Sequence, residues 1–283
     1  MKVYTKKSEI SNAIGALKTE ALSIGMVPTM GALHQGHLQL VIRALHENDI
    51  VVVSIFVNPT QFDNGDDLDK YPRTLNSDVA LLKTVSKDAI IVYAPSVDDI
   101  YEGNTVSESF DFDGLEYEME GKFRHGHFDG VGTIVKRFFE IVKPDKAYFG
   151  EKDFQQLQII KKLVKKYHLP VIIIGCEIHR ETNGLAMSSR NTRLKPKYKA
   201  AAPFIYKTLT AAKIKFGTKS AGRVSEWVEN QFKKHDLLEL EYFLIADAAT
   251  LKPVQRKSDK KEYRAFIAVY AGDVRLIDNI ALN

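Results

Sequence analysis

Residues 23–47 read SIGMVPTMGALHQGHLQLVIRALHE, which is a short apolar run, a turn containing glycine and a longer amphipathic stretch. We predict a buried strand at Ser23–Val27 and a helix at Gln35–Glu47. The next segment, Ile50–Val57, reads IVVVSIFV and is almost continuously apolar. Such a run is typical of a parallel strand that is covered on both faces. Strand, turn, helix and strand together predict a βαβ unit.

Strands and helices continue to alternate as far as residue 175. The further predicted elements are a helix at 74–87, a strand at 89–94, a helix at 130–142, a strand at 145–149, a helix at 154–167 and a strand at 171–175. This alternation predicts an α/β fold with a Rossmann-like, doubly wound parallel sheet and right-handed crossovers. The polar stretch from about 98 to 122 shows no clear pattern.

A smaller C-terminal α+β domain is predicted because the pattern changes near Glu177. Two helical stretches, at 196–216 and 221–235, precede three strand-like runs, at 240–246, 263–270 and 274–280. The boundary is expected within 176–184, which gives a domain at 1–178 and a second domain at 179–283.

The composition limits the classes of protein to which the chain could belong. The chain has 283 residues, 45% of them hydrophobic and 27% charged, with a net charge of +4 from 40 basic and 36 acidic residues. This small excess does not predict a protein that binds nucleic acid or a membrane surface, although it suits an anionic small molecule. The single cysteine, Cys176, excludes an intramolecular disulfide and a cysteine-based zinc cluster. The sequence has no apolar signal core and no run of about 18 apolar residues, so we expect a cytoplasmic protein that does not span a membrane.

The turn PTMGALHQGH, residues 28–37, is the first candidate for chemistry. It follows a strand of the predicted parallel sheet, and ligands bind outside the carboxyl ends of such strands. Gly31 and Gly36 allow close backbone approach, and the N-terminus of the following helix favours a phosphate. His34 and His37 could donate hydrogen bonds to phosphate oxygens. The alternative is a tight turn with two surface histidines.

Three further segments carry polar side chains at strand ends or at the predicted boundary. In FGEKDFQQ (149–156), Lys152 offers a cation to a phosphate and Asp153 a possible metal-facing carboxylate, although Asp153 could simply cap the helix. In MSSRN (187–191) two hydroxyls and a guanidinium could wrap a polyphosphate, although a serine-containing linker is common. In FVNPTQF (56–62) the amides of Asn58 and Gln61 suit hydroxyl and carboxylate recognition, although Asn-Pro also forms turns.

The order of these segments resembles that of the pantothenate synthetases, the pantoate–β-alanine ligases of the nucleotidylyltransferase superfamily that also contains class I aminoacyl-tRNA synthetases. PTMGALHQGH (28–37) is similar to a variant of the superfamily's H-x-G-H box, and MSSRN (187–191) is similar to its KMSKS-like loop. Further matching segments are VVSIFVNPTQF (52–62), YPRTL (71–75), GHFDGVGTIV (126–135), FGEKDFQQL (149–157) and RLIDN (275–279). The matches cover nearly the whole chain.

The resemblance implies a ligase of pantothenate biosynthesis that works in two steps. ATP and pantoate would give pantoyl-adenylate and pyrophosphate, and the amine of β-alanine would then attack the adenylate to give pantothenate and AMP. The resemblance also implies Mg²⁺, a Rossmann-like N-terminal domain and a homodimer.

The resemblance assigns roles to residues by motif position. His34 and His37 would contact ATP phosphates, with His37 as proton donor. Lys152 would bind phosphates in the adenylation transition state, and Ser188, Ser189 and Arg190 would hold the β- and γ-phosphates. The other implied ATP-site residues are Met30, Gly31, Ala32, Leu33, Gln35, Gly36, Gly150, Glu151, Asp153, His179 (through its backbone) and Met187. Gln61 and Gln156 would orient pantoate, with Gln61 also near the β-alanine position.

One departure from the family pattern and two alternative functions bear on this interpretation. Arg124-His125-Gly126-His127-Phe128 has His125 where the family usually has proline, which is expected to loosen that loop but retains Arg124 and His127. A related nucleotidyltransferase, or a fragment of a tRNA synthetase, would make another adenylate, but the chain carries the pantoate-type glutamines and no basic stripe. A non-catalytic nucleotide sensor would not need the full set of His34, His37, Lys152 and Arg190.

Overall fold

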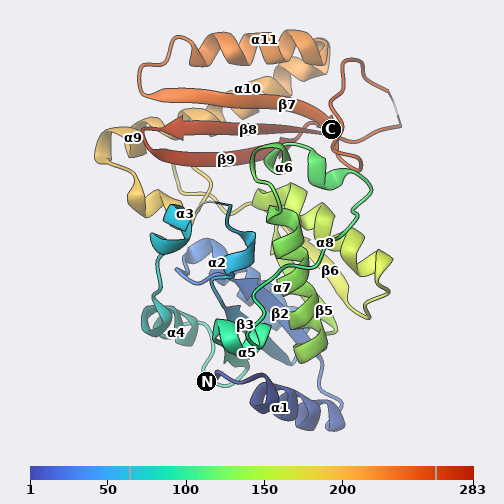
Figure 1. Cartoon of the computed structure of the whole chain (residues 1–283). Helices are drawn as coiled ribbons and strands as arrows, with labels where there is room; N and C mark the ends of the chain where they lie inside the picture. Colours follow the sequence, from blue (N-terminus) through green and yellow to red (C-terminus); the bar gives the residue numbers. More distant parts are fainter. Residues whose placement is uncertain (64, 259) are drawn as a thin grey trace. The chain divides into compact units, whose positions relative to one another are not determined.

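The computed structural model describes residues 1–63, 65–258 and 260–283. The chain divides into two compact units (Figure 1). The first unit is Met1–Glu151 with Gln155–Glu177, and the second unit is Lys152–Phe154 with Ile178–Asn283. The short segment Lys152–Phe154 therefore belongs to the second unit, although the chain on both sides of it belongs to the first.

The first unit contains a six-stranded, fully parallel sheet, as predicted. Its strand order is β1 (Lys2–Tyr4), β4 (Ile90–Tyr93), β3 (Ile50–Ile55), β2 (Ile24–Thr29), β5 (Lys146–Gly150) and β6 (Ile172–Cys176). The chain runs outward from β2 to β3 and β4, and it then returns to place β5 on the other side of β2. The strand order therefore reverses between β2 and β5, which makes this edge the expected ligand crevice of an open α/β sheet.

Helices cover both faces of this sheet, which confirms the doubly wound prediction. On one face, α2 (Gln35–Glu47) and α4 (Leu75–Lys83) bury Leu38, Val41 and Leu82 against alternate strand residues. On the other face lie α7 (His127–Val142), whose Phe138 packs edge-on against Tyr93 of β4, and α8 (Phe154–Lys166). The helix α1 (Lys7–Thr19) packs against α7. Near-continuous apolar strands are required because each strand meets a helix on both faces.

The structure differs from the sequence predictions mainly in weakly patterned segments. The three-residue β1 and the helix α1 were not predicted, because α1 buries only Ile10 and Ile14 among mostly polar residues. The polar stretch from about 98 to 122 overlaps the short helices α5 (Val97–Tyr101) and α6 (Glu120–Phe123). The short helix α3 (Gly65–Asp69) was not predicted either.

The second unit is a small α+β layer pair, as predicted. Its antiparallel sheet has the order β7 (Leu238–Asp247), β8 (Tyr263–Ala271) and β9 (Val274–Ala281). The helices α10 (Phe204–Thr218) and α11 (Ala221–Phe232) pack on one face of this sheet. The predicted helix 196–216 is divided into α9 (Pro196–Ala201) and α10, with Pro203 between them. Proline interrupts a helix because it lacks an N–H group.

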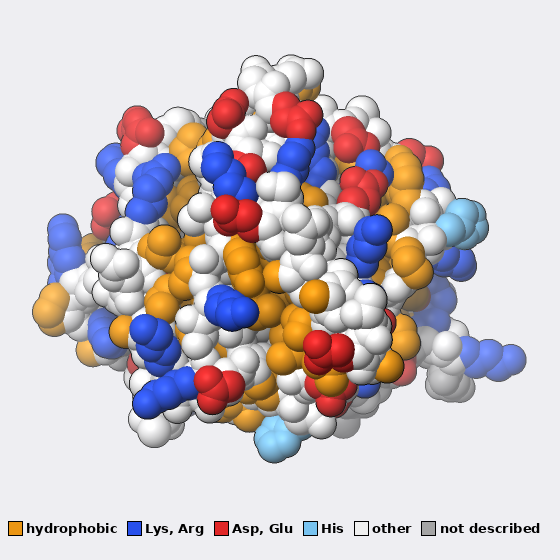
Figure 2. All heavy atoms as spheres, turned by 90° about the horizontal axis from the view of Figure 1, so that it is seen from below, with side chains coloured by type: hydrophobic (Ala, Val, Ile, Leu, Met, Phe, Trp, Pro, Cys, Tyr) orange, Lys and Arg blue, Asp and Glu red, His pale blue; other side chains and the backbone are white. Residues whose placement is uncertain are grey.

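The molecular surface seen in Figure 2 mixes charges of both signs. Lys and Arg side chains alternate with Asp and Glu over this face, with hydrophobic side chains scattered between them. Interspersed charge of this kind is typical of a solvated surface. Within the described ranges, no helix combines the length and the apolar character needed to cross a membrane.

Candidate active site

The loop 28–37, which includes the end of β2 and the first residues of α2, lies at the edge where the strand order reverses. Its backbone takes left-handed conformations at Gly31 (φ +82°) and at Ala32 (φ +50°). Thr29 supports the start of the turn, because its Oγ1 accepts the N–H of Gly31 (3.1 Å) and donates to the carbonyl of Ser54 on β3 (2.7 Å). A non-glycine residue with positive φ persists only where its surroundings fix it.

Asp78 holds the same loop from α4. Its carboxylate is 2% exposed and accepts the backbone N–H groups of Ala32 (3.1 Å) and Leu33 (2.8 Å). Thr74 donates to both carboxylate oxygens at 3.2 Å. A Cβ at Gly31 would come within 3.1 Å of Asp78 Oδ2, so glycine allows the close approach. Sequence reasoning missed Asp78, although an aspartate on the apolar side of a predicted helix was an available signal.

The two histidines of the loop cap α2 with their own rings. His34 Nδ1 accepts the N–H of Gly36 (3.1 Å), and His37 Nδ1 accepts the N–H of His34 (3.3 Å). The ring centroids are 4.0 Å apart. A neutral imidazole that accepts at Nδ1 carries its proton at Nε2. The backbone therefore selects the tautomer in which both Nε2–H groups are donors, which is the form that a phosphate oxygen requires.

Gln61 lies after β3 and is buried among groups that set the orientation of its amide. Asn58 Nδ2 donates to Gln61 Oε1 (3.3 Å) and to the carbonyl of Gly130 (3.1 Å), which fixes the Asn58 amide. Tyr101 donates to Asn58 Oδ1 at 2.6 Å. Gln61 Nε2 points to the thioether of Met30 (3.0 Å), a weak acceptor. The amide N–H of Gln61 therefore faces the loop 28–37, where an anionic oxygen would be a stronger acceptor.

His127 and Arg124 hold the backbone of Gln61. Arg124 Nη1 donates to His127 Nε2 (3.2 Å), so His127 Nδ1 carries the proton and donates to the carbonyl of Gln61 (2.8 Å). Burial, with the Arg124 charge beside it, lowers the pKa of His127 to about 4. His125, which stands where the family usually has proline, is exposed in this turn.

Acid should destabilise the protein through His127. The folded pKa of about 4 lies below the usual value of 6.5, so the unfolded chain binds more protons between these values and stability falls as pH drops through that window. The loss should total about 3 kcal/mol of unfolding free energy by pH 4. Thermal or denaturant unfolding between pH 4 and 7 measures it. His127→Gln should be less stable than wild type at pH 7, with a difference that shrinks toward pH 4. A constant difference would contradict this assignment.

The β5–α8 connection places its polar residues in two different units. Gly150 and Glu151 belong to the first unit, whereas Lys152 and Asp153 belong to the second. Lys152 Nζ lies 3.4 Å from Asp153 Oδ1. Gln156 is half-buried on α8.

Gln155, next to Gln156, has a structural role. It is 5% exposed, and its amide N–H groups donate to the carbonyls of Leu115 (2.9 Å) and Glu118 (2.7 Å), while its oxygen accepts the N–H of Glu120 (3.0 Å). Gln155 therefore ties the polar stretch before α7 to α8.

The MSSRN loop lies in the second unit. Ser188 caps a 3-10 helix, Ser189–Arg193, by accepting the N–H of Arg190 at Oγ (3.3 Å). Met187 is joined to His179 by a backbone hydrogen bond of 3.0 Å. The side chains of Met187, Ser188, Ser189 and Arg190 are half-buried, and that of His179 is exposed. Within the described residues, no group of three or more His, Cys, Asp or Glu side chains could hold a metal ion.

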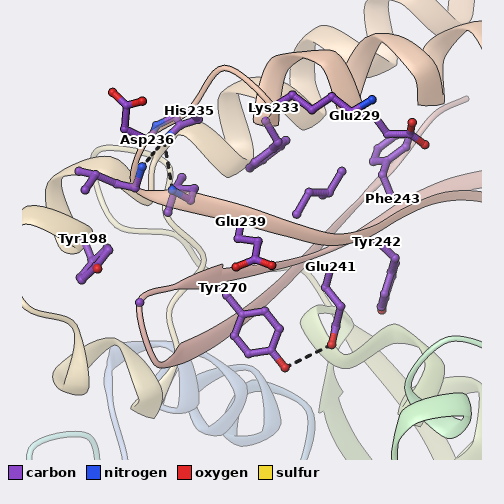
Figure 3. A pocket seen from close by; sticks show the side chains of 15 residues that line it. Tyr198, Glu229, Lys233, His235, Asp236, Glu239, Glu241, Tyr242, Phe243 and Tyr270 are labelled. Atoms are coloured by element: carbon purple, nitrogen blue, oxygen red, sulfur yellow. Dashed lines mark hydrogen bonds between the residues drawn. The ribbon is translucent and has the colours of Figure 1, made fainter.

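A separate pocket of about 760 Å³ occurs in the second unit, near the start of β7 (Figure 3). None of the sequence-predicted site residues lines it. Its Glu241 accepts from Tyr270 (3.3 Å) and pairs with Arg275 (2.6 Å). The charge of this glutamate is therefore already balanced by its neighbours.

A parallel sheet whose switch-point loop presents two histidine donors beside a buried amide defines a nucleotide-binding α/β protein. Comparison with known proteins identifies the family within this class. The family described as pantoate-beta-alanine ligase matches residues 2–281. The chain belongs to this family of enzymes.

The similarity extends over whole chains. A pantothenate synthetase of Christiangramia forsetii is 57% identical over 283 residues, 100% of both chains. A crystal structure of the pantothenate synthetase from Thermus thermophilus superposes with a TM-score of 0.91 at 37% identity, covering 100% of this chain and 99% of that one. A pantoate–β-alanine ligase from Francisella tularensis, complexed with beta-gamma ATP and β-alanine, gives a TM-score of 0.80 at 34% identity over 100% and 98% of the chains. These end-to-end matches rule out the tRNA-synthetase-fragment alternative.

Proposed function

We propose that this chain condenses pantoate with β-alanine through a pantoyl-adenylate, releasing pyrophosphate in the first step and AMP in the second. The main support for the proposal is the geometry of the loop 28–37. Its two imidazoles are held as Nε2–H donors at the switch point, beside the donor amide of Gln61. This arrangement provides donors for phosphate and for a carboxylate at one sheet edge, as an acid-activating enzyme requires.

The first step needs no general base. A carboxylate has a pKa near ~4, so pantoate is already ionised when it attacks the α-phosphorus of ATP. The attack forms the acyl–phosphate bond and breaks the bond to pyrophosphate, and negative charge grows on the phosphate oxygens. Catalysis therefore consists of positioning the reactants and stabilising this charge. His34, His37 and Lys152 would supply that stabilisation, with the Nε2–H group of His37 donating a hydrogen bond to the phosphates.

The family resemblance assigns further ATP contacts by motif position. Ser188, Ser189 and Arg190 would hold the β- and γ-phosphates, and Arg190 offers a planar fork suited to phosphate. The backbone of His179 would contact adenine. The remaining proposed ATP contacts are Met30, Gly31, Ala32, Leu33, Gln35, Gly36, Gly150, Glu151, Asp153 and Met187.

Mg²⁺ would enter with ATP. In ATP-using sites Mg²⁺ is usually held by one or two carboxylates together with substrate phosphates. Asp153, an exposed carboxylate next to Lys152, suits such a contact. The ion would neutralise phosphate charge when bound.

Gln61 and Gln156 would bind pantoate, and Gln61 would also lie near β-alanine. In the second step β-alanine, having lost one proton from its ammonium group, attacks the acyl carbon. The carbon–nitrogen bond forms, the acyl–phosphate bond breaks, AMP leaves, and the nitrogen releases a second proton to solvent. The orientation of Gln61 supports this assignment, because its N–H group faces the loop 28–37.

The larger-scale features of the proposal are the two domains, the location and the assembly. The domain 1–178 would bind ATP and pantoate, and the domain 179–283 would act as a lid that carries the Ser188–Arg190 loop. A cytoplasmic location is supported by the single buried Cys176, which suits a reducing compartment. A homodimer rests on the resemblance to the family, and light scattering of the purified protein tests it.

AMP release separates this function from the alternatives. The purified chain is incubated with ATP, Mg²⁺, pantoate and β-alanine, and each component is omitted in turn. We expect pantoate-dependent pyrophosphate release, and AMP release that also needs β-alanine. ATP binding without pantoate-dependent turnover would support the nucleotide sensor instead.

Gln156→Ala should weaken pantoate binding selectively. Loss of a hydrogen bond to a charged ligand is expected to raise the KM for pantoate about tenfold or more while the KM for ATP stays unchanged. Steady-state kinetics with each substrate varied measure both constants. Gln155→Ala is the matched control, which should lower the melting temperature without a selective effect on pantoate. An equal loss of ATP affinity in Gln156→Ala would count against the assignment.

A further inference from the structure

The motif RLIDN (275–279) on β9 contains two buried polar residues that the proposed chemistry does not use. Asp278 is 4% exposed and Asn279 is 2% exposed. Buried polar side chains are costly unless they are hydrogen-bonded, so their partners indicate what they hold in place.

Asn279 fastens the backbone of Lys152. Its Nδ2 donates to the carbonyl of Lys152 at 2.9 Å, and its Oδ1 accepts from Arg264 of β8. The guanidinium of Arg264 lies 4.0 Å from the centre of the Phe154 ring, which also contacts Phe266 at 5.9 Å. Lys152 and Phe154 are thus both attached to the sheet of the second unit. This attachment explains why three residues between β5 and α8 belong to that unit.

Asp278 fastens the segment that leads into the MSSRN loop. It forms a bidentate pair with Arg180, at 2.6 Å and 2.9 Å. Arg180 Nη1 also donates to the carbonyl of Gly184 (3.1 Å), and its guanidinium lies 3.7 Å from the centre of the Tyr206 ring. Paired planar groups of this kind fix the position of an arginine in both distance and angle.

Arg180 belongs to a hairpin that positions Ser188–Arg190. Arg180 pairs with Ala186 as an antiparallel bridge, and the hairpin ends at the hydrogen bond from Met187 to His179. Asn191 Nδ2 then donates to the carbonyl of Ala186 (3.0 Å), which ties the far end of the loop to the same hairpin. Because Asp278 holds this hairpin, it holds both ends of the Ser188–Arg190 loop.

We propose that Asp278 and Asn279 are a positioning pair that fixes Lys152 and the Ser188–Arg190 loop relative to each other. Two adjacent residues of one strand hold the two segments, so the distance between the phosphate-binding groups is set by β9. Misplacement of a charged group by about 1 Å can cost on the order of 100-fold in rate. The inference rests on the proposed function, since it assumes that Lys152 and this loop bind the phosphates of ATP.

A double-mutant cycle between Asn279 and Lys152 tests the first half of the pair. Asn279→Ala should slow adenylate formation about 10- to 100-fold, with the KM for pantoate unchanged. In the Lys152→Ala background the same change should cost less than about threefold, because it then has no lysine to position. Asn279→Asp keeps an acceptor for Arg264 and removes the donor to Lys152, so it should match Asn279→Ala.

Asn283→Ala is the matched control for this cycle. Asn283 also joins two backbone groups of the second unit, accepting from Tyr263 and donating to Lys261. We expect unchanged adenylation rates for Asn283→Ala in both backgrounds. Thermal unfolding of every variant checks that the chain folds.

The possible outcomes separate the inference from the function on which it rests. A normal adenylation rate in Asn279→Ala and Asn279→Asp would overturn the positioning role of Asn279. An equal loss of rate on Asn279→Ala in the wild-type and in the Lys152→Ala background would overturn it as well. A near-normal rate in Lys152→Ala alone would instead remove Lys152 from the proposed chemistry. Asp278→Asn weakens the pair with Arg180 and should raise the KM for ATP about tenfold with the KM for pantoate unchanged. An unchanged KM for ATP would remove Asp278 from the pair.

Discussion

Lys152→Ala is expected to lower the rate of adenylate formation at least ~100-fold without loss of folding. The Lys152 ammonium is a positively charged hydrogen-bond donor, and Asn279 holds the backbone of this residue. The ammonium can therefore stabilise the developing phosphate charge without reorganisation. Its contact with Asp153, at 3.4 Å, is an ion pair between neighbouring residues and contributes little to stability. The measurement is pantoate-dependent exchange of pyrophosphate into ATP, together with the melting temperature.

Two further variants sharpen this prediction. Lys152→Arg keeps the charge but changes its shape, and it should restore only part of the rate. Lys162→Ala is the control, because Lys162 lies on the helix that follows Lys152, α8, pairs with Asp113 at 2.7 Å and has no part in the proposed site. Near-normal exchange in Lys152→Ala, or an equal loss in Lys162→Ala, would refute the assignment.

The fold was predictable wherever the sequence pattern was strong. The helix Gln35–Glu47 has the predicted bounds, and the bounds of β2, β3 and β4 lie within two residues of the predicted ones. These segments are buried on both sides, so their composition carries the signal. The helix α1 buries only Ile10 and Ile14, and such a narrow apolar stripe resembles ordinary polar sequence.

The candidate site was predictable only where its residues are contiguous in the sequence. His34 and His37 lie three residues apart, and their spacing suggested a shared face. The acceptors of the loop backbone lie elsewhere in the chain, since Asp78 binds Ala32 across 46 residues. Lys152 belongs to the second unit, where its backbone is bound by Asn279, 127 residues away in the sequence. Contacts over such distances depend on tertiary packing, which hydrophobic periodicity does not encode.

Asp78→Asn should also have a large effect, although Asp78 is expected to touch no substrate. The carboxylate accepts two successive N–H groups of the loop, from Ala32 and Leu33, whereas an asparagine offers one oxygen and would direct an N–H group at the other donor. A buried donor that loses its acceptor costs about 1–3 kcal/mol. The loop would relax from its left-handed conformation at Ala32, and the imidazoles that follow it would move away from the phosphates.

We therefore expect Asp78→Asn to lose at least ~100-fold in pyrophosphate exchange, with a lower melting temperature. Asp129→Asn is the matched control, because Asp129 also accepts a distant backbone N–H, that of Phe110 at 2.9 Å, but lies outside the loop. The control should lose stability and keep its exchange rate at temperatures where it is folded. If both variants lost exchange in proportion to their stability, Asp78 would be a structural residue. A rate loss confined to Asp78→Asn means that this carboxylate sets the geometry in which His34 and His37 meet ATP.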